Sequence, residues 1–388
     1  MSRVAAIRME ARFQAVCEAA AVAWDVPALA VGTSVAGDFE SVVVGCSPDT
    51  RFGIASITKP FTATLAIDLL DLESSSGVWP PDVRIRHLLS HTSGYDGECG
   101  DLSRFGDGDD ALASVVAELP SLRRWLHVEQ AWSYANAGYW LVGALCARRA
   151  GSTFEDALTT RVLQPLGLES TSFDEPDVPG TGKEAIDGPY PRARRPSGGL
   201  TSTVEDLVRF GQRHLASPDG ARMRIVHGKP AAGVYGLGLW GERVGGVEVW
   251  GHPGSYGGFQ TSFLVIPDRD AVFVGLTNSS RGANALHEIE NTFFERVIGE
   301  RRAEAETVAL PKEAREAFVG TYANSTSWTD VAIAGSGLAL TLDDERSTAR
   351  AIGPHTFEIT SGDSLHDRFD FPLEGFGRFG SRLAERVS

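Results

Sequence analysis

The chain has few cysteines, few lysines and no long apolar run. Its four cysteines are scattered without a CxxC spacing, so neither a metal ribbon nor a disulfide framework is indicated. Only four of the 36 basic residues are lysine, which makes a lysine inside a motif more informative than usual. The net charge of −15 argues against nucleic acid and anionic membrane surfaces as partners. No stretch approaches the roughly 20 apolar residues of a membrane span.

The first residues lack the pattern of a secretion signal. Charged residues at Arg3, Arg8 and Glu10 interrupt the apolar run of roughly 7–15 residues that such a signal needs. We therefore expect a cytoplasmic protein with reduced thiols. The sequence carries no signal for an oligomeric state.

The length and periodicity predict two unequal domains. With 388 residues and 42% hydrophobic residues, a large catalytic unit and a small accessory one are expected. We expect a helix over residues 3–24, two strands within 27–46 and a helical block over about 60–200. A β region over 234–278 and a helix over 285–299 follow. This order favours an α/β domain over residues 1–300 with a helical subdomain inserted into its sheet. A charged linker then leads into a small β-rich domain, residues 301–388.

The phrase FGIASITKPF places Ser56 three residues before Lys59. Residues three apart share one face of a helix, so the amine can reach the hydroxyl if a helix begins near Ser56. The helix N-terminus also favours a developing anion. Lysine is a base only when neutral, so burial must lower its pKa from about 10.4. Arginine cannot replace it in this role. The pair predicts a serine nucleophile with a lysine base, although such a spacing also arises by chance.

The tripeptide YAN occurs at 134–136 and again at 322–324. A phenol beside a lysine ammonium is expected to have a lowered pKa, which suits Tyr134 to exchange a proton with the serine or a leaving group. Asn136 offers both a donor and an acceptor to a substrate amide or carbonyl. The alternative for Tyr134 is packing among the neighbouring aromatic residues. Tyr322 falls after all the candidate elements, and we predict that it is a packing tyrosine in the first strand of the small domain.

A third candidate element is the glycine-rich phrase WGHPGSYGGF. Its glycines allow the backbone to approach a ligand closely. A strand edge there can supply a backbone N–H to an oxyanion hole, with His252 facing the site. The alternative is a strand-to-turn segment with a solvent-facing histidine.

Taken together, these motifs resemble those of the serine β-lactamase and penicillin-binding-protein superfamily. Ser56-Ile57-Thr58-Lys59, Tyr134-Ala135-Asn136 and His252-Pro253-Gly254 follow its order and rough spacing, and the phrases IRHLLSHTSGY and PSGGLTSTVEDLVRFGQ agree. The most similar branch is the class C-like one of esterases, D-amino-acid peptidases, amide hydrolases and acyltransferases. The resemblance covers about residues 1–300. It implies a β-lactamase-like α/β fold, an antiparallel sheet flanked by helices with an inserted all-helical subdomain. The C-terminal segment resembles the small barrel- or lipocalin-like domains of some members.

The resemblance also implies roles for individual residues. Ser56 would be the acylated nucleophile, Lys59 a base or proton relay, and Tyr134 a general acid or base. Asn136 would bind the substrate, and the N–H groups of Ser56 and Ser255 would form the oxyanion hole. The substrate-binding set is then Asn136, His252, Gly254 and Ser255. No metal or other cofactor is implied.

His252 stands where true β-lactamases carry a lysine. Histidine is mostly neutral at pH 7, so the site lacks one fixed positive charge for a β-lactam carboxylate. We therefore rank β-lactamase activity below ester, amide or acyl-transfer chemistry. The connection after Leu72 and the segment before FGIAS are both short, so the substrate range of relatives does not transfer directly.

Other site types find little support. His87 and His91 are four apart, but no HExxH glutamate accompanies them, so metal binding is disfavoured. No G-x-S-x-G elbow indicates an α/β-hydrolase. The leading hypothesis is a serine hydrolase acting on an ester or amide of a small molecule through acyl-Ser56. A transacylase of natural-product biosynthesis with an amine or alcohol acceptor, and a non-catalytic penicillin-recognition-like binding protein, are the alternatives.

Overall fold

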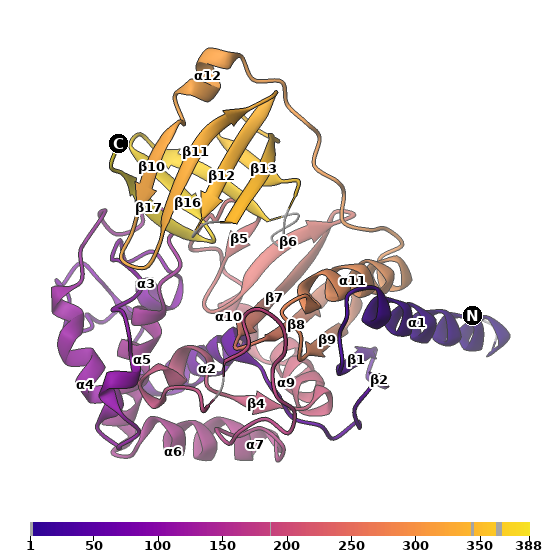
Figure 1. Cartoon of the computed structure of the whole chain (residues 1–388). Helices are drawn as coiled ribbons and strands as arrows, with labels where there is room; N and C mark the ends of the chain where they lie inside the picture. The colour runs from indigo at the N-terminus through magenta and orange to yellow at the C-terminus, as the bar shows by residue number, and fades with distance from the viewer. Residues whose placement is uncertain (1–2, 187, 343–344, 362–366) are drawn as a thin grey trace.

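The computed structural model describes residues 3–186, 188–342, 345–361 and 367–388 (Figure 1). Within these residues the larger domain is built on a seven-stranded antiparallel sheet in the order β2-β1-β9-β8-β7-β6-β5. Its strands are β1 (Leu29–Val35), β2 (Asp38–Val44), β5 (Val234–Tyr235), β6 (Trp240–Val244), β7 (Val247–Tyr256), β8 (Phe259–Ile266) and β9 (Ala271–Thr277). The predicted β-lactamase-like α/β class is confirmed.

Two tight turns set the register of this sheet. Ala36 and Gly37 join β1 to β2, and Gly257 and Gly258 join β7 to β8, all four with positive φ. Two residues of positive φ match the twist of the strands that they connect, which is why glycine recurs here. The second turn ends the strand that carries the HPG motif and so fixes where that motif lies.

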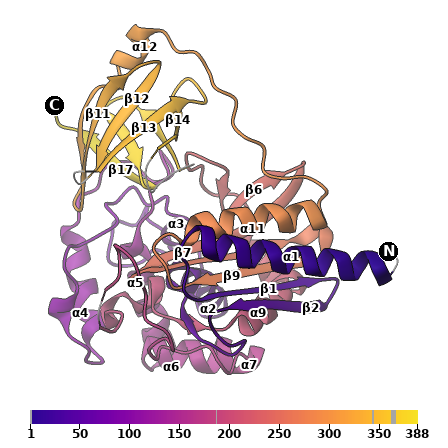
Figure 2. The same cartoon turned by 45° about the vertical axis from the view of Figure 1, so that its right-hand side comes forward.

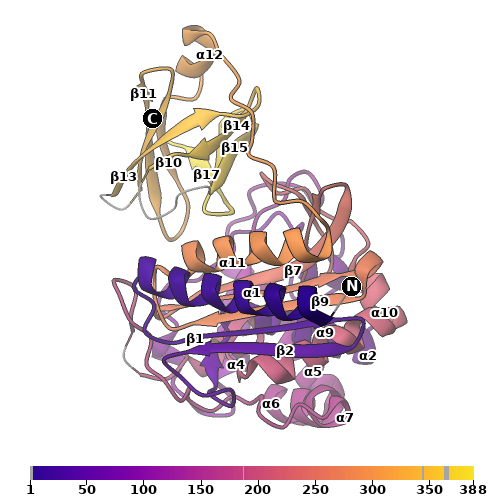
Figure 3. The same ribbon diagram turned by 90° about the vertical axis from the view of Figure 1, so that its right-hand side faces the viewer.

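Two long helices cover one face of the sheet. Helices α1 (Arg3–Ala23) and α11 (Gly282–Val297) lie side by side across it (Figures 2 and 3). Phe13 and Cys17 of α1 share a buried apolar cluster with Phe293 of α11 and Phe273 of β9. No helix in the described part of the chain is both long and apolar enough to cross a bilayer.

The other face carries the helical block. Its helices are α2 (Thr58–Leu69), α3 (Ile85–Leu89), α4 (Ala111–Glu118), α5 (Asn136–Ala150), α6 (Phe154–Leu158), α7 (Gln164–Leu166), α8 (Arg195–Gly198), α9 (Val204–Ala216) and α10 (Pro218–Met223). A small two-stranded ladder, β3 (Phe52–Gly53) with β4 (Thr201–Ser202), ties the start of this block to its end. Phe61 of α2 stacks on Phe210 of α9, which packs against Phe263 of the sheet. These ring contacts anchor helix α2, and the turn directly before it, to the sheet.

The C-terminal part is a closed barrel of eight strands among the described residues. They are β10 (Gly320–Ala323), β11 (Trp328–Ala334), β12 (Gly337–Leu342), β13 (Glu345–Ala351), β14 (Thr356–Ile359), β15 (Arg368–Leu373), β16 (Phe376–Phe379) and β17 (Arg382–Arg386), preceded by helix α12 (Lys312–Glu316). Aromatic rings of Phe357, Phe369, Phe371 and Phe379 pack against one another inside. The interior is therefore a packed core.

The barrel sits over the helical block and the β5–β6 end of the sheet (Figure 1). Residues 301–311 carry no helix or strand, but Arg302 anchors their start through ion pairs to Glu242 and Glu290, at 2.7 and 2.5 Å. On the far side, Arg378 of β16 donates to the carbonyls of Trp132 and Lys229. The larger domain thus holds the start of the linker through Arg302 and contacts the barrel directly through Arg378.

The buried histidines make stability depend on pH. Burial, aided by Arg224, lowers the pKa of His214 on α9 from 6.5 to about 3. Between these values the unfolded chain binds a proton that the folded one does not, so stability falls as pH falls, by about 1.4 kcal/mol per pH unit. Burial also lowers the pKa values of His87, His91, His227 and His252, so each of them makes stability fall as pH falls.

We expect His214→Leu to reduce this acid sensitivity, because it removes one such group without changing the side-chain volume much. The melting temperature of the natural protein should fall more between pH 7 and pH 4.5 than that of the variant. At pH 8, above both pKa values, the proton linkage of His214 vanishes, so any remaining difference reports packing alone. If the melting temperatures of the two proteins changed in parallel with pH, His214 would not be a source of the acid sensitivity.

Candidate active site

Ser56 lies in a 3-10 turn, η1 (Ala55–Ile57), directly before α2. The residue before it, Ala55, has a φ of +45°, a conformation that costs an L-residue free energy. The turn is held from behind because the backbone N–H of Ile54 donates to the Leu200 carbonyl at 3.0 Å. The strained turn therefore presents Ser56 at the N-terminus of the helix, as the sequence predicts.

Lys59 is fully buried beside Ser56. Its Nζ lies 3.0 Å from Ser56 Oγ and 2.7 Å from the Ser197 carbonyl oxygen on α8. Burial lowers the pKa of the amine well below its usual range. Glu98 opposes this shift, whereas Arg194 and Arg382 add to it. Lys59 is therefore set up as a neutral amine that can accept the Ser56 proton.

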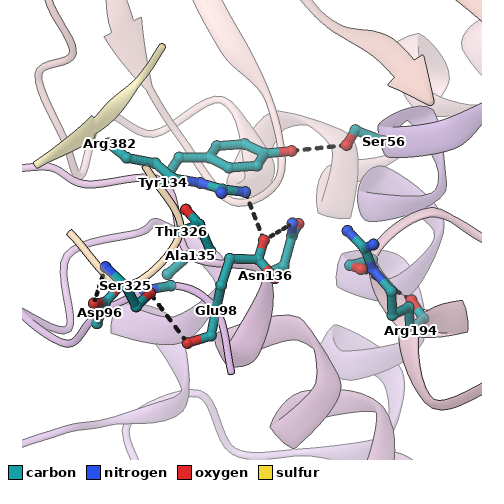
Figure 4. A network of polar contacts seen from close by, with 12 residues as sticks. Ser56, Asp96, Glu98, Tyr134, Ala135, Asn136, Arg194, Ser325, Thr326 and Arg382 are labelled. Atoms are coloured by element: carbon teal, nitrogen blue, oxygen red, sulfur yellow. Dashed lines mark hydrogen bonds and ion pairs between the residues drawn. The ribbon is translucent and has the colours of Figure 1, made fainter. Parts of the chain in front are cut away.

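Tyr134 completes the contacts of the serine. Its hydroxyl donates to Ser56 Oγ at 2.8 Å (Figure 4). Burial raises the pKa of this phenol, with the hydrogen bond to Ser56 acting in the opposite direction. The expected lowering of the Tyr134 pKa was wrong, because the phenol is itself buried and burial penalises the charged phenolate. Tyr134 thus stands as a proton donor in the unliganded site.

Asn136 is oriented by a carboxylate. Its Nδ2 donates to Glu98 Oε1 at 2.5 Å, and a guanidinium nitrogen of Arg382 donates to the same oxygen at 2.5 Å (Figure 4). A carboxylate only accepts hydrogen bonds, so the amide must turn its NH₂ toward Glu98. The Oδ1 of Asn136 is left buried, with no hydrogen-bond partner among the described residues.

The barrel supplies some of the contacts that hold Tyr134, Asn136 and Glu98 in place. Arg382 begins β17, and the Ser381 carbonyl before it accepts from the Tyr134 backbone N–H at 3.0 Å. A barrel loop also reaches the site, since the Ser325 N–H donates to Asp96 Oδ2 at 3.2 Å. Asn324 shapes that loop by accepting from the Ser327 N–H. The asparagine of the second YAN, Asn324, therefore shapes the barrel loop that contacts Asp96.

Tyr322 itself packs in the barrel core. It is 2% exposed, contacts Phe371 and Phe379, and donates to the Phe318 carbonyl at 3.0 Å. The prediction of a packing tyrosine at this position is confirmed.

The end of β7 forms the opposite wall of the site. Strand β6 pairs with β7 only as far as Gly251, so the edge of residues 252–256 is free on that side. A Cβ added at Gly254 would lie 2.3 Å from the Ile54 carbonyl oxygen, which explains why glycine stands there. Ser255 is exposed, and its Oγ accepts from Gln260 Nε2 at 2.9 Å. The edge approaches the turn that holds Ser56.

His252 is buried under this edge. Its Nδ1 lies 2.6 Å from the Pro253 carbonyl oxygen and its Nε2 lies 3.1 Å from the Tyr235 hydroxyl. Burial, aided by Lys59, lowers the pKa of His252 to about 3. The ring is therefore neutral, and both of its nitrogens are engaged by protein groups.

His87 and His91 have separate structural roles. The Nδ1 of His87 accepts from the Arg84 N–H, whereas the Nδ1 of His91 accepts from the Ala135 N–H at 3.0 Å. His91 thus fixes the backbone between Tyr134 and Asn136. No cluster of three potential metal ligands occurs among the described residues.

Four further residues contact the site or influence its charges and were not predicted from the sequence: Glu98, Arg194, Ser197 and Arg382. A glutamate in the glycine-flanked phrase YDGECG was the only local signal for Glu98. Arg382 lies 284 residues from Glu98 along the chain, so no spacing rule brings them together.

Several known proteins are similar to this chain in sequence. A family model described as Beta-lactamase matches residues 21–293. The chain is 27% identical to penicillin-binding protein 4 of Amycolatopsis lactamdurans, over 76% of this chain and 93% of that protein. It is 26% identical to a D-aminopeptidase of Brucella anthropi, over 76% of this chain and 59% of that protein.

Some solved structures match both domains. The crystal structure of SurE with D-Leu superposes with a TM-score of 0.79 at 22% identity, covering 98% of this chain and 100% of that one. At this identity the likeness shows the shared fold. With the family match over most of the larger domain, it follows that the chain belongs to the beta-lactamase family and is one of its serine hydrolases.

Proposed function

We propose that the protein hydrolyses an amide of a D-amino acid through a covalent acyl-Ser56 intermediate. The observation that carries the proposal is the double contact of Ser56 Oγ, 3.0 Å from a buried amine and 2.8 Å from a phenol. A serine placed between a base and an acid is the arrangement that nucleophilic catalysis requires.

In the first half-reaction, Ser56 Oγ attacks the substrate carbonyl carbon while its proton passes to the neutral Lys59. The N–H groups of Ser56 and Ser255 would stabilise the oxyanion that forms. When the C–N bond breaks, the leaving nitrogen takes the Tyr134 proton, and the proton held by Lys59 restores the phenol. Water then attacks the ester, and the reverse proton movements release the acid and Ser56.

The substrate class is proposed from relatives and from charge. Two similar proteins carry names that mention D-amino acids, the D-aminopeptidase and SurE with D-Leu. His252 is neutral and engaged, so it offers no fixed positive charge to a β-lactam carboxylate. This favours amides, and esters by the same path, over β-lactams.

Acyl transfer is the second candidate because of the space beside the site. A groove of about 1660 Å³ runs between the barrel and the sheet, lined by Trp132, Trp240 and Ser255 among others. It can admit an amine or alcohol acceptor larger than water.

We expect Ser56→Ala to abolish covalent labelling by a fluorophosphonate probe, because the probe phosphonylates the activated hydroxyl. Intact-mass spectrometry should show one adduct on the natural protein and none on the variant. Ser103→Ala, at an exposed serine of the helical block, is the matched control and should label fully. Equal labelling of Ser56→Ala, or no labelling of the natural protein, would leave a binding protein rather than an enzyme.

The two YAN tyrosines should behave differently. Tyr134→Phe should lower kcat/KM for D-alanine 4-nitroanilide by about 10²–10⁴-fold, because the leaving group loses its proton donor. Tyr322→Phe should change it less than twofold and cost about 1 kcal/mol of stability, since only the hydrogen bond to Phe318 is lost. Similar rates for both variants would refute the role of Tyr134.

Hydrolysis and transfer can be separated by partition. During turnover of D-alanine 4-nitroanilide with added benzylamine, we expect free D-alanine to exceed D-alanine benzylamide. Liquid chromatography of the products measures the ratio directly. A benzylamide majority at millimolar acceptor would make transfer the principal activity.

A further inference from the structure

We propose that the acyl residue accepted by this site is acidic, with an α-nitrogen N–H bound by Asn136 Oδ1 and a side-chain carboxylate bound by Arg194. This rests on the proposed function and names its substrate class more closely. Each of the two residues carries a buried polar atom, Asn136 Oδ1 and Arg194 Nε, that has no hydrogen-bond partner among the described residues.

Arg194 differs from its neighbours on the same turn. Arg192 and Arg195 both pair with Glu155, at 2.9 and 2.7 Å. Arg194 makes no ion pair within the described part of the chain, and its buried Nε has no hydrogen-bond partner there. Its guanidinium instead lies 5.7 and 5.4 Å from the ring centroids of Tyr190 and Tyr256. A cation held beside two rings by cation–π contacts still has N–H donors available.

The guanidinium is directed at the catalytic site. Figure 4 shows it turned toward Asn136 and Glu98, on the side of the site away from Arg382. Two hydrogen bonds hold residues 194–197 in place. Ser197 Oγ donates to the Arg194 carbonyl at 2.9 Å, and the Ser197 carbonyl accepts from Lys59. The position of Arg194 is thereby tied to that of the catalytic base.

The other charges of the site are already compensated. Glu98 is paired with Arg382, and burial lowers the pKa of the Lys59 amine. Arg194 feels the charge of Glu98 but forms no ion pair with it or with another described carboxylate, so its positive charge has no direct partner. A substrate carboxylate would supply that balance, and a guanidinium binds it through two parallel N–H bonds.

We assign the acyl half of the substrate to this side because the proposed proton donor faces the other one. Trp132, Trp240 and Ser255 line the open groove, whereas Asn136 and Arg194, like Ser56, do not. Tyr134, the proposed donor to the leaving nitrogen, stacks on Trp240 at the groove. The leaving group would depart through the groove, while the acyl residue stays beside Asn136 between the two reaction steps.

The test compares D-glutamate α-(4-nitroanilide) with D-glutamine α-(4-nitroanilide), which differ in charge but hardly in size. The natural protein should favour the glutamate compound in kcat/KM by about tenfold or more. Arg194→Gln should bring the ratio close to one, and Arg194→Lys should keep part of the preference. Arg192→Gln, which removes a paired positive charge from the same turn, should leave the ratio unchanged.

Equal rates for the two anilides in the natural protein, or a ratio unaffected by Arg194→Gln, would overturn the inference and leave the proposed function intact. Failure to turn over either anilide while Ser56 still labels with the fluorophosphonate would also overturn it. Failure to label Ser56 at all would instead overturn the proposed function.

Discussion

The burial of one amine is the constraint on which the rest of this site depends. Lys59 has no exposed surface, and its Nζ contacts the Ser56 hydroxyl, the Ser197 carbonyl and the faces of Tyr134 and Tyr139. A charged ammonium is costly in these surroundings, so burial, with Arg194 and Arg382 acting in the same direction, favours the neutral amine. The packing that excludes water from Lys59 therefore favours the form of the amine that the proposed mechanism needs.

The second domain takes part in the site. Arg382 neutralises Glu98, the Ser381 carbonyl fixes the backbone of Tyr134, and Ser325 binds Asp96. Through Glu98 these contacts fix the orientation of the Asn136 amide, whose Oδ1 is left without a partner among the described residues. The barrel core is filled with aromatic rings, so the outer surface, and not the interior, carries this role. Removing the barrel would free the asparagine to turn and would leave Glu98 uncompensated.

The sequence predicts the parts of the site that lie close together in the chain. Ser56 and Lys59 share a helical turn, and the phrases around Tyr134 and Gly254 fix their own local geometry. It could not predict the partnership of Glu98 with Arg382, which depends on docking between domains. The pKa of Tyr134 was predicted in the wrong direction because the shift is governed by burial of the phenol, which depends on the packing of segments far apart in the chain. Tyr322 was predicted correctly, whereas the loop-forming role of Asn324 was missed.

The protonation state of Lys59 is the most direct test of this account. The chain has only four lysines, so labelling lysine with ¹³C and ¹⁵N gives a spectrum simple enough to resolve each side chain. The Lys59 signal is identified by its loss in Lys59→Met. The account predicts that at pH 8 this signal has the chemical shift of a neutral amine. An ammonium shift for Lys59 at that pH would contradict it and leave Ser56 without its base.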